Sequence, residues 1–197
     1  MGGTFDPIHL GHLVAAEEAL VHFNLDRVIF MPTGRPAFKE NLPVSAPEHR
    51  YLMTVLATTA NPDFDVSRLE IERPGLTYTV DTLLSLHELY GPSTELFFIT
   101  GADAVWDIVS WKDADKIADL TTFIAATRPG YDLEAAARAR EDAATRFRIE
   151  YLEVPALAIS STDIRERVAD RRPIRYLTPE VVAAYIAKYG LYRGVPA

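Results

Sequence analysis

Cysteine is absent from the 197 residues of this chain, and so are long apolar runs. Without cysteine, the chain forms no disulfide and offers no thiolate to a metal ion, which fits a reducing compartment. No apolar stretch approaches the roughly 18 residues of a bilayer-spanning helix, and no charged segment followed by an apolar one resembles an export signal. We therefore expect a cytoplasmic protein with no membrane partner.

Basic side chains are also in short supply, since 20 Lys and Arg stand against 28 Asp and Glu, for a formal net charge of -8. A chain without a basic stripe is poorly suited to follow a phosphate backbone, so we expect no nucleic-acid partner. A local set of donors can still hold one nucleotide. The length and a hydrophobic content of 48% favour a single domain over residues 1–197, and leave a homo-oligomer open.

Short apolar runs separated by helical patterns predict an α/β fold. The runs Val28–Met31, Leu96–Ile99 and Phe123–Ala126 are typical of strands buried on both faces of a parallel sheet. The first helical pattern begins near Leu10, and the last, over residues 178–190, predicts a small C-terminal helical portion. The expected architecture is a Rossmann-like doubly wound parallel sheet, which binds ligands at the carboxyl ends of its strands.

Capping patterns predict where further helices begin. Ser45 and Glu48 have the spacing of a capping box, and Thr79 precedes a leucine-rich helical pattern that it can cap. Residues 132–145 are rich in Ala and Arg, which favours a surface helix.

The opening MGGTFDPIHLGHL has the composition of a ligand-binding turn. Gly2 and Gly3 let the backbone come close to a ligand. His9 and His12 are three residues apart at the entrance of the first helix, where free N–H groups favour anions, so the pair suits a phosphate. A surface or core histidine is the ordinary alternative, and a zinc site would need a third ligand. The G-x-G-x-x-G of dinucleotide-binding oxidoreductases is not matched.

Gly2-Gly3 also fits the end of a first strand, yet only Met1 precedes it. Because a strand needs about 4–6 residues, we expect the natural protein to begin several residues upstream with a short apolar segment. The alternative is that Met1–Thr4 alone fills the end of that strand.

Five stretches together carry a family resemblance. GGTFDPIHLGH resembles the first signature of the HxGH nucleotidyltransferases. The other four are GAD (Gly101–Asp103), SWK (Ser110–Lys112), RPGY (Arg128–Tyr131) and ISSTDIRERV (Ile159–Val168). The set is similar to the bacterial nicotinate-nucleotide adenylyltransferases, from Gly2 to about Arg193. Phosphopantetheine adenylyltransferases share the first motif without the series, and class I aminoacyl-tRNA synthetases carry a KMSKS-like loop that is missing here.

The resemblance implies that ATP and nicotinate mononucleotide react to deamido-NAD and pyrophosphate, with Mg²⁺ on the pyrophosphate oxygens. The attacking phosphate is already ionised, so the reaction needs alignment and charge neutralisation more than a general base. Nicotinamide mononucleotide or phosphopantetheine as the acceptor remains an alternative. A non-catalytic adenine-nucleotide sensor is a second, although the histidine motif and Arg165 are both intact.

The resemblance also implies roles for individual residues. The catalytic set is His9, His12 and Arg165. The ATP-binding set is Gly3, Thr4, Phe5, His12, Lys39, Gly101, Asp103, Ile159, Ser160, Ser161 and Arg165. The set for nicotinate mononucleotide is Gly2, Thr77, Tyr78, Thr79, Trp111, Arg50 and Arg128. No side chain is expected as a dedicated metal ligand.

Several of these residues also have purely structural explanations. Ser160 and Asp163 have the spacing of a capping box, although hydroxyls at a helix start also form a phosphate nest. Asp103 either accepts from ribose hydroxyls or caps a following helix. Trp111 offers a flat face to a pyridine ring or fills a core, and the arginines contact substrate or water.

One loop departs from the family pattern. Where the family often has Pro-Pro-His-Lys, this chain reads RPAFK over Arg35–Lys39, so Lys39 keeps a cation while Phe38 replaces the histidine. The loop Thr33–Val44 is long and proline-rich, which suits a lid over the site.

Overall fold

The computed structural model describes residues 1–35, 44–105, 107–127, 146–155 and 158–194. Its strands are β1 (Gly2–Gly3), β2 (Val28–Pro32), β3 (Phe64–Val66), β4 (Phe97–Gly101), β5 (Thr122–Thr127) and β6 (Ile149–Glu153). Its helices are α1 (Leu10–His22), α2 (Pro47–Thr58), α3 (Leu69–Glu72), α4 (Thr79–Tyr90), α5 (Ala102–Val105), η2 (Ile108–Ser110), α6 (Ala114–Leu120), α8 (Ser161–Ala169) and α9 (Glu180–Tyr189). The three predicted strands are confirmed as β2, β4 and β5. The surface helix predicted over 132–145 lies outside the described residues.

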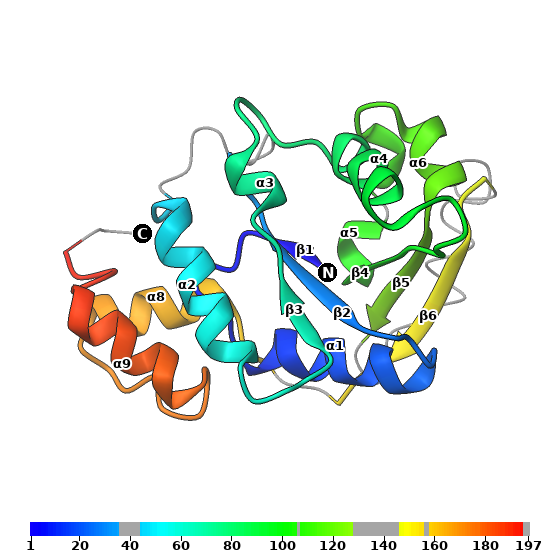
Figure 1. Cartoon of the computed structure of the whole chain (residues 1–197). Helices are drawn as coiled ribbons and strands as arrows, with labels where there is room; N and C mark the ends of the chain where they lie inside the picture. Colours follow the sequence, from blue (N-terminus) through cyan, green and yellow to red (C-terminus); the bar gives the residue numbers. More distant parts are fainter. Residues whose placement is uncertain (36–43, 106, 128–145, 156–157, 195–197) are drawn as a thin grey trace.

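Every strand ladder is parallel, in the two sets β1-β2-β3 and β4-β5-β6. Strand β1 joins the sets in space, since it lies between β2 and β4 (Figure 1) and a Cβ built on Gly2 would stand 3.2 Å from the Phe98 ring. The spatial order is therefore 3-2-1-4-5-6, the doubly wound order, although β1 and β4 share no ladder in the described residues.

Helices cover both faces of this sheet, as neighbouring side chains of β5 show. Ile124 packs in a core cluster that includes Ala16 and Ala19 of α1. Its neighbours Phe123 and Ala125 face a second cluster built with α4, α5 and α6. Because successive strand side chains point to opposite faces, the predicted doubly wound α/β architecture is confirmed.

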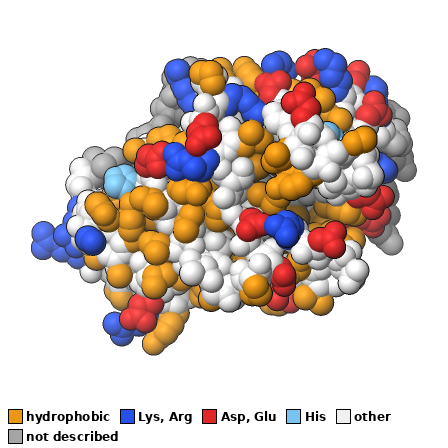
Figure 2. All heavy atoms as spheres, viewed as in Figure 1, with side chains coloured by type: hydrophobic (Ala, Val, Ile, Leu, Met, Phe, Trp, Pro, Cys, Tyr) orange, Lys and Arg blue, Asp and Glu red, His pale blue; other side chains and the backbone are white. Residues whose placement is uncertain are grey.

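The predicted C-terminal helical portion is formed by α8 and α9, at the left of Figure 1 beside α2. Thr178 donates to the Ile8 carbonyl at 2.8 Å, which ties the start of α9 to the first sequence motif. As predicted, α9 ends at Gly190, whose φ of 64° is the left-handed conformation of a helix C-cap. Hydrophobic side chains gather over α2 in Figure 2, where Leu52 and Leu56 are partly exposed. Over the described ranges, no helix is both long and apolar enough to cross a bilayer.

Two predicted helix caps are wrong. Helix α2 begins at Pro47 after the N-cap Ala46. The Ser45 N–H donates to Asp6 Oδ2 at 3.0 Å, and Glu48 pairs with Arg68 instead of accepting from Ser45. Helix α4 begins at Thr79 itself, and its N-cap is Tyr78. Asp103 lies inside α5 and not at the position before its first residue, where a helix N-cap stands.

The first strand is the shortest of the sheet. The Met1 amino group donates to the Ile29 carbonyl at 2.8 Å, and the Met31 N–H donates to the Met1 carbonyl at 2.9 Å. A cavity of about 720 Å³ lies beside β1 and is lined by β2, β4 and α4 residues. The expectation of a longer first strand stays a prediction.

Candidate active site

The two histidines of the first motif form one unit at the start of α1. His9 is the N-cap, and its N–H donates to His12 Nδ1 at 3.2 Å. The rings stack with centroids 3.7 Å apart and planes 25° apart. The sequence-based prediction that they share one side of the helix is confirmed.

Burial keeps both imidazoles neutral at pH 7. It lowers the pKa of His9 to about 4, and together with the neighbouring His9 it lowers the pKa of His12 to about 3. Since His12 Nδ1 accepts a hydrogen bond, the proton of the neutral ring sits on Nε2. His12 therefore presents an N–H donor, while His9 Nδ1 is buried with no hydrogen-bond partner among the described residues.

The loop before the histidines is shaped by Phe5. Its φ of 50° is a left-handed conformation that is rare for a bulky side chain and is found where function or packing demands it. The ring is buried against Phe30 and against the edge of His12, with centroids 5.8 and 5.1 Å away. A Cβ on Gly3 would stand 2.8 Å from the Phe5 ring, so any larger residue at this position would have to displace that buried ring.

Helix α8 closes over the same loop. Its N-cap Ser160 accepts from the Asp163 N–H at 3.1 Å, which is one of the two bonds of the predicted capping box, while the Asp163 carboxylate pairs with Arg167. Ser161 Oγ donates to the Pro7 carbonyl and one Arg165 nitrogen donates to the Asp6 carbonyl, each at 2.8 Å. The structure thus brings the histidine motif and the ISSTDIR segment together, although they are about 150 residues apart in the sequence.

Arg50 is held inside the protein, with only 1% of its surface exposed. Its nitrogens donate to the carbonyls of Ser45, Thr4 and Gly34 at 2.8–2.9 Å. It therefore clamps the loop after β1 to the segment after β2. This burial favours a positioning role over the direct substrate contact expected from the sequence.

A second part of the site is a hollow of about 300 Å³ at the carboxyl ends of β1 and β4. Its lining is Gly2, Gly3, Thr4, Thr33, Glu70, Thr77, Tyr78, Thr79, Phe98, Thr100, Ala104, Trp111 and Lys112. Most residues predicted to contact nicotinate mononucleotide are in this set. Trp111 stands edge-on to Phe98 and Phe123, with ring centroids 5.8 and 6.4 Å away.

The N-terminus of α4 opens at this hollow. Tyr78 is its N-cap, and within the described residues no side chain forms a capping hydrogen bond there. Thr77 is fixed by its N–H, which donates to the Arg35 carbonyl at 2.9 Å. Free N–H groups at a helix N-terminus attract negative charge, so this wall of the hollow suits an anionic group.

Of four other predicted site residues, two are not described by the structure and two are described by their position in the backbone. Lys39 and Arg128 lie outside the described residues. Gly101 ends β4 and Asp103 follows it in α5, at the expected edge of the sheet.

Sequence reasoning missed two residues of the site, Asp6 and Glu70. Asp6 is buried and accepts from the Ser45 N–H and, at 2.7 Å, from the Tyr192 hydroxyl. Glu70 lines the hollow, where burial raises the pKa of its carboxyl, and accepts from the Thr82 hydroxyl at 2.8 Å. A glutamate in the charged run RLEIER gives no signal of burial.

The buried histidines predict a pH dependence of stability. Their pKa values fall from 6.5 in the unfolded chain to about 4 and about 3 in the fold, so the unfolded state binds more protons below pH 6.5. We therefore expect the free energy of unfolding to fall as pH drops from 6.5 toward 4, measured by urea denaturation. A His9→Asn/His12→Asn variant should lose stability less steeply over the same pH range. Other buried groups, such as the Met1 amine with its pKa of about 5, contribute equally to both proteins, so the difference between the two slopes reports the histidines. Identical slopes would mean that neither ring is buried as described.

Several comparisons with known proteins agree with this geometry. The sequence profile of the Cytidylyltransferase-like family matches residues 1–167. A protein of Moorella thermoacetica named "Probable nicotinate-nucleotide adenylyltransferase" is 55% identical over 195 residues, covering 98% of this chain and 90% of the relative. A protein of the same name from Corynebacterium jeikeium is 54% identical over 196 residues, covering 98% of each chain.

The fold has solved counterparts as well. The structure titled Plasmodium falciparum nicotinic acid mononucleotide adenylyltransferase complexed with NaAD matches with a TM-score of 0.78 and 22% identity, over 97% of this chain and 94% of that one. The complex of the same protein with APC matches with a TM-score of 0.75. At this identity the likeness concerns the fold alone.

Proposed function

Because the chain belongs to the nicotinate-nucleotide adenylyltransferases, within the cytidylyltransferase-like family, we propose that it transfers the adenylyl group of ATP to nicotinate mononucleotide. The products are deamido-NAD and pyrophosphate. The observation that carries the proposal is the position of the aromatic, anion-favouring hollow, which shares Gly3 and Thr4 with the loop that leads to the histidine pair.

The reaction is a single displacement at phosphorus. A phosphate oxygen of nicotinate mononucleotide attacks the α-phosphorus of ATP, and the bond from that phosphorus to the bridging oxygen breaks. Pyrophosphate leaves with the electron pair, so no proton has to move and no general base is required. Holding both substrates in line can supply about 7–11 kcal/mol of the barrier.

The chain supplies donors for the negative charge that builds up at the α-phosphate. His12 donates through Nε2, Arg165 brings a full positive charge, and α1 and α8 both begin beside the Asp6-Pro7 loop. Each such donor is worth roughly 3–4 kcal/mol in the transition state. We assign His9 a positioning role instead, since its N–H and its stacked ring hold the ring of His12 in place.

ATP enters as its Mg²⁺ complex, in which phosphate oxygens are the main ligands. Within the described residues, no three His, Asp or Glu side chains converge as a metal site. Asp6, the carboxylate nearest the histidine loop, is already occupied by Tyr192 and the Ser45 N–H. When bound, a cation carried by the substrate would neutralise charge on the leaving pyrophosphate.

The proposal is tested by pyrophosphate release from ATP and Mg²⁺ with each acceptor in turn. We expect fast release with nicotinate mononucleotide, slower release with nicotinamide mononucleotide, and none with phosphopantetheine. A preference for phosphopantetheine would assign the chain to a different adenylyltransferase. ATP binding without release for any acceptor would favour a nucleotide sensor.

Trp111 provides a second test, because in this proposal its side chain packs against the pyridine ring of nicotinate mononucleotide. We expect Trp111→Ala to raise the KM for nicotinate mononucleotide several-fold while the KM for ATP changes less. Trp111→Phe keeps an aromatic face and should recover most of the loss. A larger effect on ATP than on the acceptor would move Trp111 out of the acceptor pocket.

A further inference from the structure

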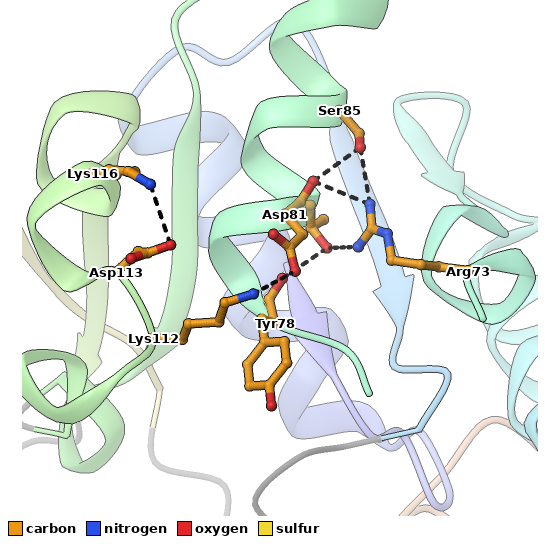
Figure 3. Close-up of polar contacts among 8 residues, drawn as sticks. Arg73, Tyr78, Asp81, Ser85, Lys112, Asp113 and Lys116 are labelled. Atoms are coloured by element: carbon orange, nitrogen blue, oxygen red, sulfur yellow. Dashed lines mark hydrogen bonds and ion pairs between the residues drawn. The ribbon is translucent and has the colours of Figure 1, made fainter. Parts of the chain in front are cut away.

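Lys112 carries a positive charge at the hollow, and the reaction scheme above leaves it unused. It directly follows Trp111 and lines the hollow with Tyr78 and Thr79. Its Nζ lies 3.5 Å from Asp81 Oδ2 and 4.4 Å from the centroid of the Tyr78 ring (Figure 3). Among the described residues that line the hollow, only Lys112 carries a full positive charge.

The contact between Lys112 and Asp81 is one that a ligand can replace. At 3.5 Å it is longer than the 2.7–2.9 Å typical of strong charge-assisted hydrogen bonds. The two side chains are 47% and 37% exposed, and ion pairs of this kind contribute little to stability. Asp81 also lies in the first turn of α4, where the helix N-terminus stabilises its charge without Lys112.

The two other charged side chains near Lys112, Arg73 and Glu70, already have hydrogen-bond partners. Arg73 donates to the Thr82 hydroxyl, the Asp81 carbonyl and the Ser85 hydroxyl at 2.9–3.1 Å, on the far side of Asp81 in Figure 3. Glu70 accepts from Thr82 and is buried. An anionic ligand in the hollow therefore finds Lys112 as its charged partner among the lining side chains.

We propose that Lys112 is a specificity-determining residue, which leaves Asp81 and pairs with the carboxylate of the nicotinate ring. The inference rests on the proposed function. The carboxamide of nicotinamide carries no charge, so it gives Lys112 no reason to leave Asp81. Lys112 thereby adds a charge-selective contact to the neutral N–H groups at the start of α4.

The test compares three variants by kcat/KM for the acid and for the amide mononucleotide. We expect Lys112→Gln to lower the efficiency with the acid about fivefold, mainly through KM, and to leave the amide within twofold. Lys112→Arg keeps the charge and should retain most of the acid-to-amide ratio. Lys116→Gln is the matched control, because Lys116 pairs with Asp113 at 3.4 Å and does not line the hollow.

The outcomes separate this inference from the proposed function. An unchanged acid-to-amide ratio in Lys112→Gln, or equal losses with both acceptors, would overturn the role of Lys112 while the wild-type activity stands. Equal effects of Lys112→Gln and Lys116→Gln would also overturn it, because they would reflect surface charge in general. A wild-type protein that uses neither acceptor would instead refute the proposed function itself.

Discussion

His12→Ala is expected to lower kcat by about 10²–10³-fold while the protein stays folded, because it removes one preorganised donor to the α-phosphate. The ring is neutral and its Nδ1 already accepts from the His9 N–H, so Nε2 is the atom available to the substrate. Steady-state turnover with saturating ATP and nicotinate mononucleotide measures the effect, and circular dichroism checks the fold.

Two further variants make the His12 prediction specific. His12→Asn retains an acceptor for the His9 N–H but loses the Nε2 donor, so it should be about as slow as His12→Ala. His22→Ala removes the exposed histidine in the last turn of the same helix and should leave turnover unchanged. A folded His12→Ala or His12→Asn protein with near-normal turnover would remove His12 from the chemistry.

The wild-type protein is expected to favour nicotinate over nicotinamide mononucleotide by tens-fold or more in kcat/KM. The start of α4 after Thr77 and Tyr78 is worth up to about 2 kcal/mol to a partly buried negative charge. That energy corresponds to roughly 30-fold at 25 °C, before the hydrogen bonds to the carboxylate are counted. Initial rates over a range of each acceptor give the ratio, and equal efficiencies would refute the assignment of the hollow to the nicotinate ring.

The sheet was predictable from the sequence where strands are long and apolar. Val28–Met31, Leu96–Ile99 and Phe123–Ala126 match β2, β4 and β5 within two residues at each end. The strands β3 and β6 were not predicted. Phe64–Val66 is only three residues long, and Ile149–Glu153 is interrupted by two glutamates at the edge of the sheet, so neither forms a continuous apolar run.

Local motifs indicated where the site lies, but its long-range contacts are not encoded locally. The spacing of His9 and His12 was enough to predict a shared helix face. Arg50 was not predictable as a clamp, because its partners are backbone carbonyls, which no residue type signals, and those of Gly34 and Thr4 lie 16 and 46 residues away in the sequence. The predicted capping box of Ser45 and Glu48 fails for the same reason, since the Ser45 N–H donates to Asp6, 39 residues away, and Glu48 pairs with Arg68.

The most direct test of the proposed reaction follows the oxygen atoms of the acceptor. Nicotinate mononucleotide labelled with ¹⁸O in its phosphate is incubated with the protein, ATP and Mg²⁺, and the products are analysed by mass spectrometry. Attack by the acceptor phosphate on the α-phosphorus predicts deamido-NAD that retains all of the label and pyrophosphate that carries none. Labelled pyrophosphate, or ATP consumption without any dinucleotide, would contradict adenylyl transfer to nicotinate mononucleotide.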